Sequence, residues 1–296
     1  MKFDSYHPTI NLIFFVSVIT MTIVFQHPIY VAMSYICSFV YSVKLIGKKA
    51  LIYNFSLWIV MLGFLYYYVS FFHKGVTEIT RNYVNNVITL ESLVYGCILS
   101  LIIASVLMWI NCFHKVMSTD KVVYLFGRIA PKLSLFIAIL LRTVPRVKTR
   151  VGKISLARDS IGYGLKQGNI LRRFVNLVKV ISIIITWTLE DFVQTSDSMK
   201  CRGYGLKGRT SFSIYRFDNR DRSFVITIFW SLTLMLMAVL FNQTDIYYYP
   251  QILANKITIV SYLFYIVYAF LSLLPMGLQI AGERKFDRLY KNIEKE

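Results

Sequence analysis

The sequence predicts an all-α, polytopic membrane protein with about six transmembrane helices and a cytoplasmic helical domain between the fourth and the fifth. The chain is 56% hydrophobic but only 16% charged, whereas about a quarter of the residues of a soluble domain are charged. It nevertheless carries 33 Lys and Arg against 15 Asp and Glu, a net charge of +18. A disordered chain is excluded, because such chains are poor in apolar residues. Apolar and basic residues must therefore occupy different parts of the chain, as in a membrane protein with a basic cytoplasmic face.

The first two spans come from one long uncharged segment. Ser5–Val43 contains 39 residues without Lys, Arg, Asp or Glu. A single helix of that length would measure about 58 Å, roughly twice the ~30 Å hydrocarbon core of a bilayer. Gln26-His27-Pro28 can interrupt it, because proline breaks a helix and the neighbouring side chains are polar. We therefore expect two short spans, near residues 9–25 and 29–45.

Four further apolar segments are each long enough to cross the bilayer at about 1.5 Å per residue. These segments are Ala50–Phe72, Ser92–Phe113, Ser223–Phe241 and Ile257–Gly282. The predicted organisation is four spans in residues 1–113, a cytoplasmic domain in 114–222, two spans in 223–282 and a cytoplasmic basic tail in 283–296.

The distribution of basic residues predicts the orientation. Residues 114–222 hold 21 Lys and Arg against seven Asp and Glu, the loop at 44–49 holds three lysines, and the tail at 283–296 holds five Lys and Arg. Three loops alternate with these basic segments. The loop at 26–28 holds no Lys or Arg, the loop at 73–91 holds two, and the loop at 242–256 holds one. The basic segments are therefore expected on the cytoplasmic side, together with both termini.

Two apolar stretches inside the cytoplasmic domain are short or interrupted. Leu133–Leu141 has nine residues, and Phe174–Leu189 has 16 residues with Lys179 among them. A lysine at the centre of a span costs about 2.5–3.5 kcal/mol, which disfavours insertion. We interpret both stretches as amphipathic helices packed under the membrane domain, with Glu190 and Asp191 solvated. If both stretches crossed the membrane instead, the orientation of either end would not change.

A short internal echo, Gly-Tyr-Gly-Leu-Lys, occurs at residues 162–166 and again at 203–207. Glycines at this density end helices, because glycine adopts positive φ angles without strain. Each copy is therefore predicted to follow a helix, Ile154–Ser160 in the first case and Phe192–Arg202 in the second. The echo indicates two similar helix ends that face two similar partners.

An arginine lies near each of these helix ends, Arg158 four residues before its glycine and Arg202 one residue before. Further segments complete the layout: His7-Pro8 before the first hairpin, Leu141-Arg142-Thr143-Val144-Pro145-Arg146, the run from Thr195 to Gly205, and Gly208-Arg209-Thr210. Over nearly the whole chain, this layout resembles the transmembrane T component of energy-coupling-factor (ECF) importers of vitamins and metals.

In that family, two coupling helices each present an X-Arg-X motif, often Ala-Arg-Gly, to one of two ABC-type ATPase subunits. The resemblance assigns these motifs to Ala157-Arg158-Asp159 and Cys201-Arg202-Gly203, with departures from the family pattern at Asp159 and Cys201. Arginine suits such a contact, because its rigid fork of donors stays charged and matches carboxylates and helix C-termini.

The resemblance also implies an activity and a set of partners. The chain is expected to be a non-catalytic subunit without a cofactor of its own, because the partner ATPases bind ATP and Mg. Closure of the ATPases is expected to move the coupling helices and to rearrange the membrane domain around a membrane-embedded, substrate-binding S component. The implied setting is a bacterial plasma membrane, with membrane lipid around the spans. The S component selects the cargo, so that vitamins, cobalt and nickel all stay open.

A self-sufficient membrane carrier or channel is the alternative function, and a membrane-embedded enzyme is a third. A carrier usually keeps ionisable residues in its pathway, whereas the centres of the predicted spans hold none. An enzyme needs convergent side chains, but the four histidines are scattered, and the sequence lacks the P-loop pattern G-x-x-x-x-G-K-[ST]. Attraction to anionic lipid would also explain the basic excess. Nucleic-acid binding is not expected without an exposed aromatic and basic module.

Overall fold

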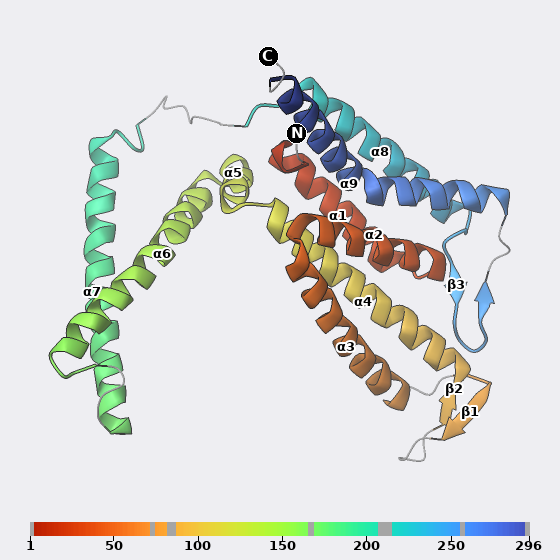
Figure 1. Cartoon of the computed structure of the whole chain (residues 1–296), viewed down its shortest axis with the longest axis horizontal. Coiled ribbons are helices and arrows are strands. Elements are labelled where there is room, and N and C mark those ends of the chain that lie inside the picture. The colour runs from red at the N-terminus through yellow and green to blue at the C-terminus, as the bar shows by residue number, and fades with distance from the viewer. Residues whose placement is uncertain are drawn as a thin grey trace. The chain divides into compact units, whose positions relative to one another are not determined.

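The computed structural model describes residues 3–71, 75–81, 87–164, 169–206, 215–254 and 258–293, most of them in α-helices (Figure 1). Residues 165–166 and 207 of the glycine echo and the Gly208-Arg209-Thr210 segment lie outside the described residues. The chain divides into two compact units. The first comprises Met1–Ser118 and Tyr215–Glu296, and the second comprises Thr119–Ile214.

The first unit is a helical bundle with two short antiparallel hairpins. Its helices are the 3₁₀ helix η1 (Phe3–Ser5), α1 (Pro8–Val24), α2 (Pro28–Ile46), α3 (Lys48–Phe71), α4 (Leu90–Val116), α8 (Asn219–Leu240) and α9 (Ile259–Ile293). In its hairpins, β1 (Glu78–Arg81) pairs with β2 (Val87–Thr89), and β3 (Ile246–Tyr247) pairs with β4 (Leu253–Ala254). The helices of the second unit are α5 (Thr119–Ile129), α6 (Pro131–Ser160) and α7 (Ile170–Cys201).

Five helices of the described chain are long and apolar enough to cross a membrane: α2, α3, α4, α8 and α9. The prediction of a helical, polytopic membrane protein is thereby confirmed. The sixth predicted span corresponds to α1, which has 17 residues and measures about 26 Å, slightly less than the ~30 Å hydrocarbon core. At the other end of the chain, α9 continues to Ile293 and includes most of the predicted basic tail.

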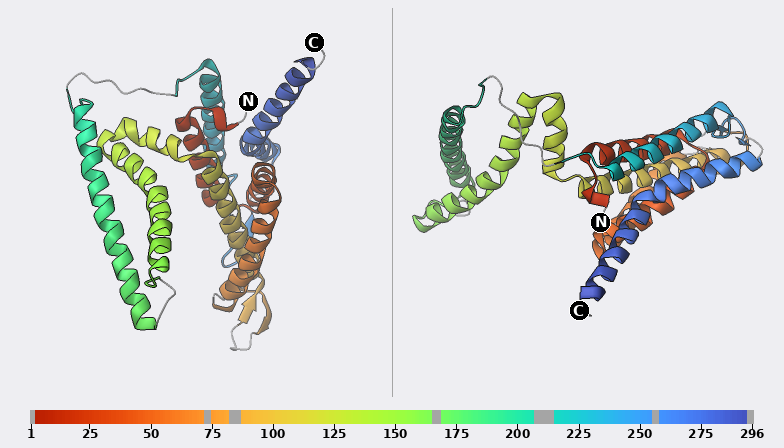
Figure 2. Two further views of the ribbon diagram at one scale, coloured as in Figure 1. Left: turned by 60° about the vertical axis from the view of Figure 1, so that its left-hand side comes forward. Right: turned by 90° about the horizontal axis from the view of Figure 1, so that it is seen from above.

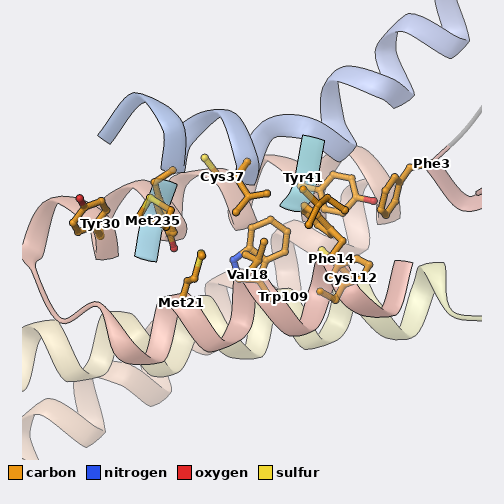
Figure 3. Close-up of a cluster of buried hydrophobic side chains, with 14 of the residues drawn as sticks. Phe3, Phe14, Val18, Met21, Tyr30, Cys37, Tyr41, Trp109, Cys112 and Met235 are labelled. Atoms are coloured by element: carbon orange, nitrogen blue, oxygen red, sulfur yellow. The ribbon is translucent and has the colours of Figure 1, made fainter. Parts of the chain in front are cut away.

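The core of the bundle surrounds the buried Trp109 of α4 (Figure 3). Phe14 and Phe15 of α1 meet this ring edge-on, each with ring centroids 6.3 Å apart, and Tyr41 of α2 lies at 6.1 Å. Trp109 Nε1 donates a hydrogen bond of 3.1 Å to Ser34 Oγ of α2, so the buried N–H group is satisfied. One aromatic cluster therefore holds α1, α2 and α4 together.

The bend predicted at Gln26-His27-Pro28 joins α1 to α2, and a His-Pro pair begins both helices. His7 Nδ1 accepts a hydrogen bond from Thr9 N at 3.3 Å, and His27 Nδ1 accepts one from Ile29 N at 3.4 Å. The proline after each histidine lies at the start of its helix, where the missing N–H has no intrahelical partner to lose. Unprotonated Nδ1 atoms therefore cap both helices.

Acidification is expected to destabilise the bundle through His27. Burial lowers the pKa of this imidazole below its ordinary value, which is about 6.5, so the folded protein binds fewer protons than the unfolded one. The contribution of His27 to stability is therefore complete above about pH 6.5 and is lost as the pH falls below it. A proton on Nδ1 would also remove the cap of α2.

The measurement is the apparent melting temperature in detergent between about pH 7.5 and pH 5.5, the range in which histidine titrates. The melting temperature should fall less steeply in His27→Asn, because asparagine also caps helices but does not titrate. The exposed His114 provides a control, and His114→Asn should keep the pH dependence of the wild type. Equal slopes in the wild type and His27→Asn would contradict the assignment.

The start of α8 is fixed by the segment that precedes α1. Asp218 and Asp221 form a capping box, in which Asp218 N donates to Asp221 Oδ2 at 3.1 Å. His7 N donates to Asp221 Oδ1 at 3.5 Å, and the Phe217 ring lies 5.7 Å from the His7 ring. The chain therefore re-enters the bundle at a point anchored to the beginning of α1.

In the second unit, two long helices replace the four short ones expected from the sequence. Each predicted pair belongs to one continuous helix: Leu133–Leu141 and Ile154–Ser160 to α6, and Phe174–Leu189 and Phe192–Arg202 to α7, with Arg202 as its C-cap residue. Basic residues between the apolar stretches suggested boundaries, but Lys and Arg are strong helix formers and allow a helix to continue. Within the described chain, α6 and α7 are not among the candidate spans.

Candidate functional site

The second unit is held together where α6 and α7 lie side by side (Figure 2). Arg150 of α6 forms an ion pair with Asp191 of α7, with Nη2 and Oδ2 2.6 Å apart. The Arg150 guanidinium also lies over the Trp187 ring, 5.8 Å from its centroid, and Nη1 donates to Trp187 O at 3.4 Å. Asp191, which we expected to be solvated, therefore ties the two helices together. No sequence signal marked this pair, because its members lie far apart in the chain.

α6 and α7 end in the same backbone closure, at the two copies of the glycine echo. In each, the tyrosine N–H donates to the carbonyl five residues earlier and the glycine N–H donates to the carbonyl three residues earlier, at 2.9–3.2 Å. The glycines, Gly162 and Gly203, have φ angles of +82° and +75°, the left-handed conformation that glycine adopts without strain. The prediction that each copy ends a helix is confirmed.

The two arginines do not occupy equivalent positions in these closures. When the helix ends are aligned on their glycines, Arg158 corresponds to Met199 and Arg202 corresponds to Ile161. Arg158 lies in the last turn of α6, whereas Arg202 is the C-cap residue of α7. Two similar helix ends therefore present their cations differently.

Arg158 is half-buried and turns toward the segment that follows α6. Its Nε donates to Tyr163 O at 3.4 Å, and its Nη2 donates to Asn176 Oδ1 of α7 at 3.3 Å. Asn176, which is buried, donates in turn from Nδ2 to Gly164 O at 3.2 Å. The guanidinium is therefore oriented by contacts inside the helical hairpin. Sequence reasoning missed Asn176, whose one signal is an amide inside an apolar stretch.

The residues beside Arg158 are more exposed than Arg158 itself. Ala157 and Asp159 both lie at the surface. Gly164 faces Asp159 closely, and a Cβ atom at position 164 would overlap Asp159 Oδ1. Gly164 therefore leaves room for the carboxylate of Asp159.

Arg202 lies in a more open environment. Cys201 and Arg202 are both exposed, Gly203 is half-buried, and Cys201 is a free thiol. The neighbouring Tyr204 and Leu206 are exposed as well. An arginine beside exposed apolar and aromatic side chains is the combination that is enriched at protein–protein contacts.

α7 separates the two arginines. Arg158 contacts Asn176, and the 26 residues from Asn176 to Arg202 span about 39 Å at 1.5 Å per residue. At that distance, the two guanidinium groups cannot hold one small ligand between them. The geometry suits two separate contacts, one at each end of the helical pair.

α7 also carries many large apolar side chains that are exposed. They include Ile170, Leu171, Phe174, Val175, Val178, Ile181, Ile185 and Trp187. An extended apolar surface of this kind marks a contact with another protein or with a membrane. Among the residues that the structure describes, no group of three or more His, Cys, Asp or Glu side chains is placed to hold a metal ion.

Gly203→Ala is expected to weaken the end of α7. A Cβ atom at this left-handed position would lie 3.0 Å from Leu206 Cδ1, and a non-glycine residue there costs about 1–2 kcal/mol. The apparent melting temperature should therefore fall by about 2–8 °C. The control is Gly152→Ala inside α6, where an added Cβ meets no atom within 4 Å, and this change should be neutral or stabilising. Equal melting temperatures for the two variants would show that the closure contributes nothing.

No known protein-family model matches the chain, and no curated protein matches it. The resemblance to the ECF T components therefore rests on the motifs quoted above.

Proposed function

We propose that this chain is the non-catalytic transmembrane coupling subunit of an ATP-driven importer of the ECF type. In this proposal, α6 and α7 are the coupling helices. Ala157-Arg158-Asp159 meets one ABC-type ATPase subunit, and Cys201-Arg202-Gly203 meets a second. These partners bind ATP and Mg, and their closure moves the two helices. The movement then reaches the membrane bundle and an S component that binds the substrate.

The observation that carries this proposal is the pair of similar helix ends, each with an arginine, about 39 Å apart along α7. Two similar ends at that separation fit two similar and separate partners. Each guanidinium offers a planar fork of donors to a carboxylate or a helix C-terminus. The Arg150–Asp191 pair supports a mechanical role, because it joins the two helices and lets a displacement of one act on the other.

A third contact is supported by the exposed apolar side chains of α7. We assign this surface to the S component, a small hydrophobic membrane protein that selects a vitamin or a transition metal. In this account the chain itself sets no substrate specificity.

We further infer that α1 crosses the bilayer as the sixth span and that both termini are cytoplasmic, in a bacterial plasma membrane. The basis is the concentration of Lys and Arg in residues 44–49, 114–222 and 283–296. Six crossings, an even number, put both termini on one side. The domain limits at 113, 222 and 282 follow from the same pattern.

Gentle extraction of the tagged full-length protein from its native membranes tests the proposal. We expect two subunits with a P-loop and one small hydrophobic membrane protein to co-purify, with ATP hydrolysis in the eluate. The ligand held by the small protein would then identify the cargo. A lone protein without ATPase activity that still transports solutes in liposomes would contradict the proposal and favour a self-sufficient carrier or channel.

A further inference from the structure

α2 and α3 diverge from the turn that joins them (Figure 1), and an apolar groove lies between them. The groove has a volume of about 520 Å³, and it is lined by Phe39, Leu51, Ile52, Asn54, Phe55 and Trp58. At one end of this lining, Trp58 Nε1 donates a hydrogen bond to the Tyr35 hydroxyl and so bridges the two helices. The groove therefore extends from the α2–α3 turn to a side-chain bridge between the two helices.

Asn54 is the unusual residue in this lining. Its side chain is 0% exposed, and neither its amide oxygen nor its amide nitrogen has a hydrogen-bond partner among the residues that the structure describes. An unsatisfied amide in an apolar environment costs several kcal/mol. A ligand that brought a hydrogen-bond acceptor to Asn54 Nδ2 would remove part of this cost, whereas a purely apolar occupant would not.

Two lysines precede the groove lining along α3. Lys48 and Lys49 are exposed in the first turn of α3, and Lys48 lies three and four residues before Leu51 and Ile52, on the same helix face. Lys44 at the end of α2 is already paired with Glu283, with Nζ and Oε2 2.7 Å apart. In the described segment that joins α2 to α3, Lys48 and Lys49 therefore remain available to an anionic group.

The spacing along α3 matches the layers of a lipid monolayer. Asn54 follows Lys48 by six residues, a rise of about 9 Å. The headgroup layer is about 5–8 Å thick on each side of the hydrocarbon core. With Lys48 at the outer edge of this layer, the ~9 Å rise places Asn54 just past its inner edge, beside the acyl esters, and the apolar part of the groove lies at the depth of the chains.

We propose that this groove binds one anionic glycerophospholipid. The lipid phosphate is held by Lys48 and Lys49, an ester carbonyl accepts a hydrogen bond from Asn54 Nδ2, and one acyl chain lies along Phe39, Ile52 and Phe55. This site lies on the membrane bundle and does not depend on the proposed ATPase contacts. It would set the angle between α2 and α3 by filling the space that separates them.

Native mass spectrometry of the full-length protein in detergent tests the site, with phosphatidylglycerol and phosphatidylcholine of identical chains added at equal concentration. We expect one phosphatidylglycerol to be retained in preference to phosphatidylcholine. Lys48→Gln should reduce this retention about fivefold, and Asn54→Leu should reduce it about five- to tenfold. Lys285→Gln, which removes an exposed lysine of α9, is the matched control and should retain the lipid.

A further variant tests the acyl-chain contact independently of charge and of hydrogen bonding. Ile52→Trp places a larger side chain at an exposed position in the groove lining and should displace the acyl chain while leaving the melting temperature unchanged. Glycerol 3-phosphate, which lacks acyl chains, should not compete. The proposal is overturned if both lipids are retained equally, if Lys48→Gln and Asn54→Leu bind phosphatidylglycerol as the wild type does, or if glycerol 3-phosphate displaces it.

Discussion

Replacing both Arg158 and Arg202 with glutamate is expected to reduce assembly with the ATPase subunits by more than tenfold. The change reverses the charge at both proposed docking points. Removal of one partner of a desolvated charged pair costs about 2–5 kcal/mol, and each 1.4 kcal/mol corresponds to about a factor of ten. Neither residue belongs to a candidate span, so the bundle should still fold and insert. The measurement is the amount of ATPase subunit recovered per tagged chain, followed by uptake.

Two controls distinguish a loss of docking from a general effect of the substitutions on α6 and α7. Lys153→Glu with Arg172→Glu makes the same change in charge at exposed positions of the same two helices, and it should leave assembly within about twofold of the wild type, as surface charges contribute little. Asn176→Leu removes the internal partner of Arg158 without reversing a charge, and it reports what the hairpin contact alone contributes. Normal assembly and uptake in the arginine double variant would remove these residues from the proposed site.

Under the proposed function, Arg150→Glu is expected to abolish most uptake while the proposed ATPase subunits stay bound. The substitution places a carboxylate against Asp191 and removes the cation from the Trp187 ring. The side chains of the ion pair are 26% and 31% exposed, so its loss should cost more than the ~1 kcal/mol of a surface pair and less than the ~3–5 kcal/mol of a buried one. We expect uptake to fall about tenfold or more, because α6 and α7 would no longer move together.

The charge-swapped variant, Arg150→Glu with Asp191→Arg, tests whether the pair itself matters. It restores opposite charges between α6 and α7, and it should recover a large part of the lost uptake. Uptake and ATP hydrolysis are measured on the assembled complex in liposomes, so that uncoupled hydrolysis is distinguished from failed assembly. A swapped variant no better than the single variant would refute the role of this pair.

The membrane helices could be predicted from the sequence because the apolar residues that define a span lie in one continuous stretch of the chain. The expected segment Ser92–Phe113, for example, lies within α4 (Leu90–Val116), since uninterrupted apolar residues suffice to identify it. The helix ends at Gly162 and Gly203 were predictable for the same reason, because a left-handed closure needs a glycine at one position.

The continuity of α6 and α7 and their contacts could not be predicted in this way. Basic residues occur both in loops and in exposed helices, so the charges between apolar stretches did not reveal whether a helix ends. Asp191 and Asn176 acquire their roles through partners far away in the chain. Nor do strands of two to four residues, as in the hairpins β1–β2 and β3–β4, leave an alternating pattern long enough to recognise.

Site-specific photo-crosslinking in native membranes tests the central claim most directly. A photoreactive residue would replace Tyr163 or Tyr204, the exposed tyrosines beside the two helix closures, and Trp230, an exposed residue of the apolar helix α8, as a control. The account predicts adducts to a P-loop ATPase subunit from both tyrosine positions and none from Trp230. Adducts to lipid alone at positions 163 and 204, or no adduct to any P-loop protein, would contradict it.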